Sequence, residues 1–454
     1  MSILVPIAMF GWIPVVLVLF ALLPPRRAVI VAMLFAWLFL PQAAYKVEGL
    51  PPYDKMTATC AGLILGAAIF DARRLLWFRP GWVDLPMAVW CLCPFISSLS
   101  NDMGAYDGLS AVFRQFVVWG LPYVIGRLYF NDLRGIGELA VGLVVGGLVY
   151  IPLCLLEIRI SPQLHRILYG FAQHSFITHV RYGGYRPMVF MPHGLIVAFW
   201  MGMCTMMCFW LWMSGTLKRL WGMPMLLWLA ALAFTLVLCK AMGPLLLFVL
   251  GCAVLMATKW RWGKVAVVLL ALVPAGYVTL RVTHVISTEQ LMSLFSFVDA
   301  DRLQSFEFRL KNEDMLLERA MQRPLVGWAG WGRARVFDEN GADLSVTDGL
   351  WIIAIGNYGL LGVSAIVVAY ALPVLLLMRR YRWQVFAHPE AAPLVAFAVV
   401  LCLAGINNLP NADSNPVFMA VMGGLAAIGM KATSEAVREV AMRLPQSRTL
   451  VGIR

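Results

Sequence analysis

Two arginines, Arg181 and Arg186, flank a pair of glycines directly before an apolar stretch of the chain. A guanidinium group binds phosphate oxygens through two parallel hydrogen bonds, so this pair is suited to holding a diphosphate at a membrane surface. Pro187 fixes the backbone after Arg186, and His193 follows closely enough to contact the same phosphate. The alternative is that both arginines only anchor the chain at the lipid interface.

A further cation, Lys240, lies in a short break between two apolar runs, at residues 238–244. An ammonium group there is costly unless it has a partner, so an ionisable residue in a membrane segment is a functional hypothesis by default. We predict that Lys240 contributes to the same diphosphate site. The alternative is that it marks a turn in contact with water.

One carboxylate differs from the other acids of the chain by its position. Asp348 follows Thr347 at the first turn of a long apolar segment, whereas the acids between residues 299 and 343 belong to a polar loop. A carboxylate placed there can act as a general base on a hydroxyl nucleophile. The alternative is structural, because Asp348 or Thr347 is also a suitable helix N-cap.

We predict no metal ion, cofactor or nucleotide site. The spacing of the four histidines His165, His174, His179 and His193 matches no common zinc pattern. The nine cysteines fall in or at the ends of apolar segments without a C-x-x-C pair, which is typical of small core residues. The chain has no nucleotide-binding motif, which argues against an ATP-driven pump.

The elements that must position these side chains are apolar helices. The chain of 454 residues is 61% hydrophobic and only 13% charged, with a mean hydropathy of +0.79. Soluble proteins carry about 25% charged residues. We therefore predict an all-α polytopic membrane protein, with a single transmembrane domain over residues 1–454 and about 12–13 transmembrane helices.

The predicted spans follow the continuous apolar runs, and the first is read as a retained span rather than a signal peptide. They cover residues 3–23, 28–43, 56–71, 84–98, 108–126, 136–156, 188–213, 222–239, 242–257, 265–283, 347–377, 391–408 and 415–430.

The formal net charge of +12 comes largely from short loops between the apolar runs, such as Arg26-Arg27 and Arg379-Arg380. Basic loops of this kind face the cytoplasm, so the charge indicates topology and a lipid bilayer partner rather than nucleic acid. Alternation then places residues 157–187 and a large helical loop, residues 284–346, on the extracytoplasmic side. A helical pattern over residues 306–321 is predicted inside the large loop.

The order of features resembles the superfamily of O-antigen ligases and O-antigen polymerases, which are membrane glycosyltransferases acting on lipid-linked glycans. The resemblance covers roughly residues 180–430. It is carried by the Arg186-Pro187 segment, the break at Lys240, the Pro-Leu-Val-Gly sequence at 324–327 and the Gly-Leu-Leu-Gly sequence at 359–362. The chain departs from the family pattern at Cys239-Lys240, where members carry Ser-Arg, and at Asp348-Gly349, where ligases carry His-Asn.

The resemblance implies a multi-pass enzyme of the bacterial inner membrane with periplasmic large loops. It would transfer a glycan from a polyprenyl-diphosphate donor to an acceptor sugar hydroxyl without a metal ion, as an O-antigen polymerase does. Arg181, Arg186, Lys240 and His193 would hold the diphosphate, and Asp348 would activate the acceptor. The alternative within the family is a ligase that attaches the glycan to lipid A core.

Three tryptophans, Trp328, Trp331 and Trp351, are expected to stack on sugar rings or to lie in an interfacial aromatic belt. A function of another class is a transporter or flippase of lipid-linked glycan, for which internal repeats and charges at mid-membrane would be expected. A third is an assembly partner without activity.

Overall fold

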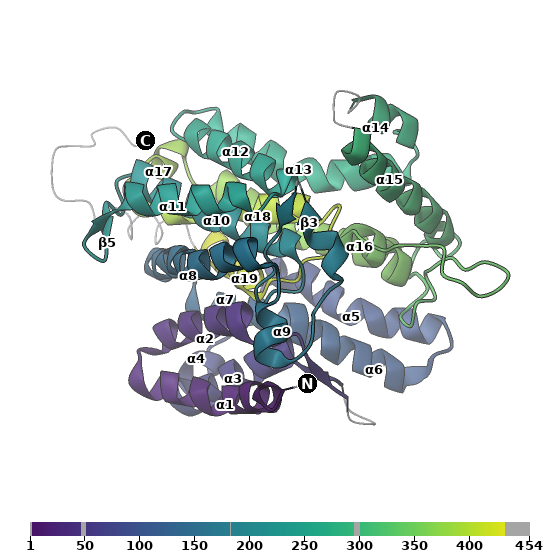
Figure 1. The fold of residues 1–454 in the computed structure, drawn as a ribbon, viewed down its shortest axis with the longest axis horizontal. Helices are drawn as coiled ribbons and strands as arrows, with labels where there is room; N and C mark the ends of the chain where they lie inside the picture. Colours follow the sequence, from purple (N-terminus) through teal and green to yellow (C-terminus); the bar gives the residue numbers. More distant parts are fainter. Residues whose placement is uncertain (1, 47–50, 182, 295–299, 432–454) are drawn as a thin grey trace.

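A computed structural model describes residues 2–46, 51–181, 183–294 and 300–431. Most of its helices run side by side along the long axis of the molecule (Figure 1). The helices are α1 Leu4–Leu22, α2 Pro25–Phe39, α3 Lys55–Phe70, α4 Ala72–Leu76, α5 Leu85–Ser100, α6 Gly104–Gln115, α7 Leu121–Tyr129, α8 Leu133–Ile160, α9 Leu164–Tyr169, α10 Gly194–Met213, α11 Met225–Leu238, α12 Met242–Ala257, α13 Gly263–Val282, α14 Thr288–Leu294, α15 Ala300–Met321, α16 Leu350–Arg380, α17 Trp383–Phe386, α18 Ala392–Asn407 and α19 Pro416–Met430.

The strands form three short antiparallel hairpins. They pair β1 Ala44–Tyr45 with β2 Tyr53–Asp54, β3 Val180–Arg181 with β4 Gly184–Tyr185, and β5 Arg219–Leu220 with β6 Met223–Pro224.

Within the described residues, eight helical segments are long and apolar enough to cross a membrane. Four further apolar helices, α3, α11, α12 and α19, have 14 to 16 residues. These lengths confirm an all-α polytopic membrane protein. The number of helices that cross stays a prediction, because a 14-residue helix is about 21 Å long and a bilayer core is about 30 Å thick.

The bounds of two predicted segments, the span over residues 188–213 and the loop helix over residues 306–321, can be compared with the observed helices. The span predicted over residues 188–213 was wrong at its start, because α10 begins at Gly194 and residues 188–191 are a buried loop. The helix predicted over residues 306–321 is confirmed, since α15 ends at Met321, before Pro324.

The core lies around α10 and α18, because 83% of the residues in the apolar part of each of these two helical segments are buried. In α18, every side chain from Leu394 to Leu401 is at most 1% exposed. A helix that is apolar on all sides fits such a position, because it is surrounded by protein. The outer helices expose large side chains instead, such as Phe234 and Leu269, as expected of a surface covered by lipid.

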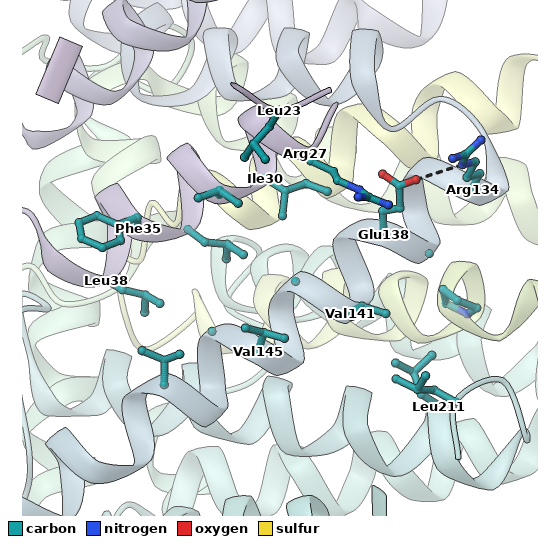
Figure 2. A pocket seen from close by; sticks show the side chains of 18 of the residues that line it. Leu23, Arg27, Ile30, Phe35, Leu38, Arg134, Glu138, Val141, Val145 and Leu211 are labelled. Carbon is teal, nitrogen blue, oxygen red and sulfur yellow. Dashed lines mark hydrogen bonds and ion pairs between the residues drawn. The ribbon is translucent and has the colours of Figure 1, made fainter. Parts of the chain in front are cut away.

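An apolar groove of about 900 Å³ runs between α2 and α8. Figure 2 shows Ile30, Phe35 and Val145 along it, with Arg27 and the Arg134–Glu138 ion pair at one end. None of the polar residues singled out by the sequence lines this groove. This groove is therefore not where the predicted chemistry lies.

The two ends of the helix bundle differ in character. We call the end that carries residues 161–193 and 283–349 the loop end; α14 and α15 mark it on the right of Figure 1. We call the opposite end, near α17 and β5, the basic end. The helices α10, α12, α16 and α19 begin at the loop end, so the residues that precede them meet there.

Candidate functional site

The segment between Arg186 and α10 is held in place by a buried carboxylate. Glu157, at the end of α8, is 0% exposed and accepts backbone N–H hydrogen bonds from three residues. Its Oε2 atom accepts from Met188 at 2.8 Å and from Val189 at 2.7 Å, and its Oε1 atom accepts from Leu164 at 2.8 Å. A buried carboxylate with three donors fixes the backbone strongly.

The same segment contains a strained residue. Val189 has a φ angle of +52°, a left-handed conformation that is rare for a β-branched residue. The Gln173 amide donates to the Val189 carbonyl at 3.0 Å, and the Phe190 N–H donates to the Tyr150 hydroxyl at 3.2 Å. Such strain costs about 1–3 kcal/mol and persists only where surrounding contacts enforce it, often at functional sites.

This fixed loop brings three of the predicted cations together. Arg186, which is 8% exposed, donates from Nη2 to the Lys240 carbonyl at 2.9 Å. Lys240 Nζ in turn donates to the Arg181 carbonyl at 3.2 Å, on strand β3. Gly194 is required beside them, because a Cβ atom there would lie 2.6 Å from Cδ of Arg186. Hydrogen bonds from side chain to backbone thus join two distant sequence segments, and we call the group of Arg181, Arg186 and Lys240 the cationic cluster.

Lys240 itself has an unusual backbone. Its φ angle is +52°, in the left-handed region, where a lysine is uncommon. It occupies the turn between α11, which ends at Leu238, and α12, which begins at Met242. The predicted break between two apolar runs is therefore confirmed. Glycine would adopt this φ angle more easily, so the turn alone does not explain a lysine here.

Three histidines gather beside the cations. The ring centroids of His174 and His193 lie 4.7 Å apart, as do those of His179 and His193. One ring nitrogen from each histidine lies within 4.8 Å of the corresponding nitrogens of the other two, close enough to consider a metal ion. His165 lies apart from them, between Tyr169 and Phe171.

The hydrogen bonds of these rings favour an anion over a metal ion. His193 Nδ1 accepts from the Leu195 N–H at 3.0 Å, so the neutral ring carries its proton on Nε2. That nitrogen can donate to a phosphate oxygen but has no lone pair for a metal ion. His179 Nε2 likewise accepts from the Gly194 N–H at 3.2 Å. This leaves His174 as the histidine best placed to offer a metal ligand, and a single protein ligand is too few for a metal site.

The pKa values of the buried His179 and the half-buried His193 are both lowered, which favours the neutral rings at physiological pH. Burial, together with the charges of His174, Arg186 and Arg181, lowers the pKa of His179 to about 4. Burial lowers the pKa of His193 to about 3, with contributions from His179, His174 and Arg186. The charge of Arg186, which contributes to both shifts, would favour an anion here, whereas burial, the largest cause of both, disfavours a charge of either sign.

Asp348 lies at the edge of this group. Its carboxylate is 3.5 Å from Nε of Arg309, and its side chain is 41% exposed. Arg309 also lies close enough to His193 to lower the pKa of that ring, so it connects Asp348 with the histidines. The predicted N-cap role is not seen, because α16 is capped at Gly349 without a side-chain hydrogen bond. An exposed carboxylate with one arginine nearby can accept a proton.

A second acid lines the same small pocket as Asp348. Glu313, on α15, accepts hydrogen bonds from the Tyr277 hydroxyl at 2.6 Å and from the Trp351 ring N–H at 3.2 Å. Its carboxylate lies 3.6 Å from Arg281. Burial raises the pKa of Glu313, while these three partners lower it. This network fixes α15 against α13 and α16 and so positions Arg309.

The three predicted sugar-stacking tryptophans differ in exposure. Trp351 is 2% exposed and packs edge-on against Tyr277, so its ring faces are closed. Arg319 and Arg323 lie over the ring of Trp328, at 3.6 and 4.8 Å from its centroid. Trp331 is 82% exposed, which leaves its ring available to a sugar or to the membrane interface.

Four residues of the site were missed from the sequence: Glu157, His179, Arg309 and Glu313. Glu157 had a usable signal, since it is a lone acid near the end of an apolar span. His179 was considered only as part of a metal pattern. Arg309 and Glu313 lie on a helix with many charges, where only tertiary contacts distinguish one charge from another.

Comparison of this sequence with protein-family models and with curated proteins finds no match.

Proposed function

We propose that the chain is a membrane glycosyltransferase that transfers a glycan from a polyprenyl-diphosphate donor to an acceptor sugar hydroxyl. The observation that carries this proposal is the convergence of Arg186 and Lys240 at the loop end, joined by a hydrogen bond of 2.9 Å, beside neutral His193. The ion pair of Arg309 with Asp348 lies at the edge of this cationic cluster.

The cluster would stabilise the leaving group. As the acceptor oxygen bonds to the anomeric carbon of the donor, the bond between that carbon and the diphosphate oxygen breaks, and negative charge develops on the diphosphate. Arg181, Arg186 and Lys240 would bind this charge, and the Nε2–H of His193 would donate to it. Cations and donors fixed before the reaction lower the barrier because they need no rearrangement.

Asp348 would take up the proton that the acceptor hydroxyl loses. A carboxylate contributes as a general base when it can reach that proton, and Arg309 would orient it. The acceptor becomes glycosylated, Asp348 becomes protonated, and polyprenyl diphosphate leaves. We assign the reaction to polymerisation of a repeat-unit glycan at the periplasmic face of a bacterial inner membrane, with ligation to lipid A core as the alternative.

The cation site is tested with Lys240→Ala and Arg186→Lys in a deletion strain, with Arg166→Ala as the matched control. Arg166 is an exposed arginine of the same loop, outside the cationic cluster. Both site variants should lose glycan assembly while the amount of protein in the membrane stays at the wild-type level. Wild-type glycan lengths in both variants would contradict the proposed diphosphate site.

The deletion strain also distinguishes the two reactions. Loss of long glycan chains indicates a polymerase, whereas accumulation of lipid-linked polymer indicates a ligase. Normal glycans of every class in the deletion strain would count against glycosyl transfer altogether.

The proton acceptor is tested with Asp348→Asn and Asp348→Glu. The asparagine variant should lose about 10²–10⁴-fold in transfer rate, as is typical of a lost general base, while glutamate retains part of the rate. The rate is measured with purified protein and a polyprenyl-diphosphate-linked glycan. Equal activity of the asparagine variant and wild type would exclude Asp348 as the base.

A further inference from the structure

A second charged pocket lies at the basic end, opposite the proposed active site. It has a volume of about 720 Å³ and is formed by the start of α2, by α4, by the end of α7 and by the end of α19. Six cations line it: Arg26, Arg73, Arg74, Arg79, Arg127 and Lys431. Among the described residues, two carboxylates line it as well, those of Asp71 and Asp132.

Two of the cations have a structural role at the end of α7. Arg26 pairs with Asp132 at 2.6 Å and also donates from Nε to the Tyr129 carbonyl at 3.0 Å. Arg74 pairs with Asp71 at 3.1 Å and donates to the Leu128 carbonyl at 3.0 Å. The last carbonyls of a helix are otherwise unsatisfied, so these arginines cap α7. Both carboxylates of the pocket are used in this way.

A third arginine is tied to an acid outside the pocket lining. Arg127 Nε lies 2.8 Å from Asp84 Oδ1, and its Nη2 donates to Oδ2 of the same carboxylate at 3.0 Å. These contacts fix its guanidinium as part of the pocket wall.

The remaining three cations form no ion pair among the residues that the structure describes, although Lys431 lies close enough to Asp132 to contribute to lowering the pKa of that carboxyl. Arg73 lies over the ring of Trp77, at 4.9 Å from its centroid, and forms no ion pair. Arg79 and Lys431 also form no ion pair within the described ranges. The three cations come from two segments of the chain, residues 73–79 and Lys431, and line the same pocket. Like charges brought together repel each other, so an anion bound between them would be favoured.

The sequence after Lys431 is itself basic in composition. Residues 432–454 contain the four arginines 438, 443, 448 and 454 and the two acids 435 and 439. An anionic ligand from outside the chain would balance the positive charge of the pocket lining.

We propose that this pocket binds the phosphate group of an anionic phospholipid at the membrane surface. Guanidinium groups match phosphate oxygens in geometry, and basic pockets between membrane helices bind anionic headgroups in this way. Trp77, which is 69% exposed, lies at the pocket as an aromatic residue does at a headgroup boundary. The bound phosphate would connect α4 with the end of α19 and stabilise the fold.

The test compares the wild-type chain with the double variant Arg79→Ala/Lys431→Ala. The control is Lys218→Ala/Arg382→Ala, two exposed cations of the basic end that lie outside the pocket. Purified protein is titrated with phosphatidylglycerol or with phosphatidylethanolamine, and binding is followed by native mass spectrometry and thermal unfolding. Inorganic phosphate forms a third arm.

We expect phosphatidylglycerol to bind wild type and control more tightly than phosphatidylethanolamine and to raise the melting temperature. Affinity should fall roughly 30-fold in the double variant, because each of the two cations near the surface contributes about a fivefold change in affinity and the two factors multiply. A response to inorganic phosphate alone, lost in the same variant, would also support a phosphate site but identify a soluble anion as its ligand.

The proposal is overturned if the double variant binds phosphatidylglycerol like wild type, or if both lipids bind every variant equally. Equal melting temperatures of variant and wild type without lipid establish that the substitutions leave the fold intact. Glycan assembly is not a readout here, so the result is independent of the proposed glycosyl transfer.

Discussion

The cations of the loop end are oriented by backbone groups. Arg186 donates to the Lys240 carbonyl and Lys240 donates to the Arg181 carbonyl, contacts that fix direction without cancelling charge. The neighbouring histidines add donors rather than charge, because burial keeps His179 and His193 neutral. An anion entering this region meets a preformed set of donors. Such preorganisation suits the binding of a leaving diphosphate.

Lowering the pH should loosen this loop. Histidine has a pKa of about 6.5 in unfolded chains, and burial lowers the pKa of His179 to about 4 in the fold. Between these values the unfolded state binds more protons, so stability rises with pH and falls as the pH drops from 6.5 towards 4. We expect faster amide hydrogen exchange in residues 174–193 at pH 5 than at pH 7, after correction for intrinsic rates.

His179→Gln should weaken this pH dependence, because glutamine does not titrate in the range. His388→Gln, at the basic end, should retain it. Exchange in this loop that is equally slow at both pH values in the wild type would show that burial of His179 does not control the loop.

Glu157→Gln should release the same segment. The amide has one acceptor oxygen, so at least one of the N–H groups of Leu164, Met188 and Val189 would face an NH₂ group. A buried unsatisfied donor costs about 1–3 kcal/mol. We expect a lower melting temperature and earlier protease cleavage within residues 186–193.

The control is Glu138→Gln, which removes the exposed ion pair with Arg134 and should change stability by less than about 1 kcal/mol. Equal melting temperatures for the two variants would mean that Glu157 does not hold the loop.

At the scale of elements, the large loop forms hydrogen bonds with the backbone of α16 where this helix is interrupted. Gly359 interrupts this helix with a φ angle of +63°. The Leu360 N–H then donates to the Pro324 carbonyl at 2.7 Å, and the Trp328 N–H donates to the Gly356 carbonyl at 2.9 Å. The two short sequences that suggested the family resemblance, 324–327 and 359–362, thus pack against each other. Their role in this chain is to join the loop to the helix that follows Asp348.

Gly359→Ala should destabilise this joint. A Cβ atom would lie 2.4 Å from the carbonyl carbon of Leu325, and the left-handed φ angle costs an alanine a further 1 kcal/mol or more, roughly. We expect a loss of about 2–4 kcal/mol in stability. Thermal unfolding and proteolysis of the large loop measure it.

The matched control is Gly276→Ala in α13, where a Cβ atom would meet nothing within 4 Å. This variant should keep or slightly raise the melting temperature, because alanine is the better helix former. The expectation for Gly359 fails if both alanine variants melt like the wild type.

At the scale of the whole molecule, opposite ends carry different functions in our proposals. The loop end gathers a strained backbone, buried histidines and an exposed carboxylate. The basic end gathers arginines that cap helices and line a phosphate pocket. In the bacterial inner membrane that we propose for this chain, basic loops stay in the cytoplasm, so the loop end should face the periplasm.

Labelling with a membrane-impermeant maleimide tests this orientation. Both test positions are exposed, and eight of the nine native cysteines are buried. Asn340→Cys, in the large loop, should react from the periplasmic side of intact cells. Lys218→Cys, at the basic end, should react only after the inner membrane is permeabilised. Reaction of both positions from the same side would refute the proposed topology.

The sequence alone determined that the chain is a polytopic helical membrane protein, because hydrophobic runs long enough to span lipid leave few other structures. It also determined where the helices break, since the charge of Lys240 and the proline at 324 act locally on the backbone. The start of α10 was not predicted correctly. Residues 188–191 are apolar, but their backbone groups form hydrogen bonds with the side chains of Glu157, Gln173 and Tyr150 instead of the hydrogen bonds of a helix.

Only the tertiary structure decided which polar residues meet. Arg186 and Lys240 are 54 residues apart, and their contact depends on how α10 packs against α11 and α12. The tertiary structure also buries the ring of Trp351 and leaves the ring of Trp331 exposed. Local sequence cannot encode such differences, because the charge of a side chain is fixed by its type whereas its partners and its exposure are set by distant segments.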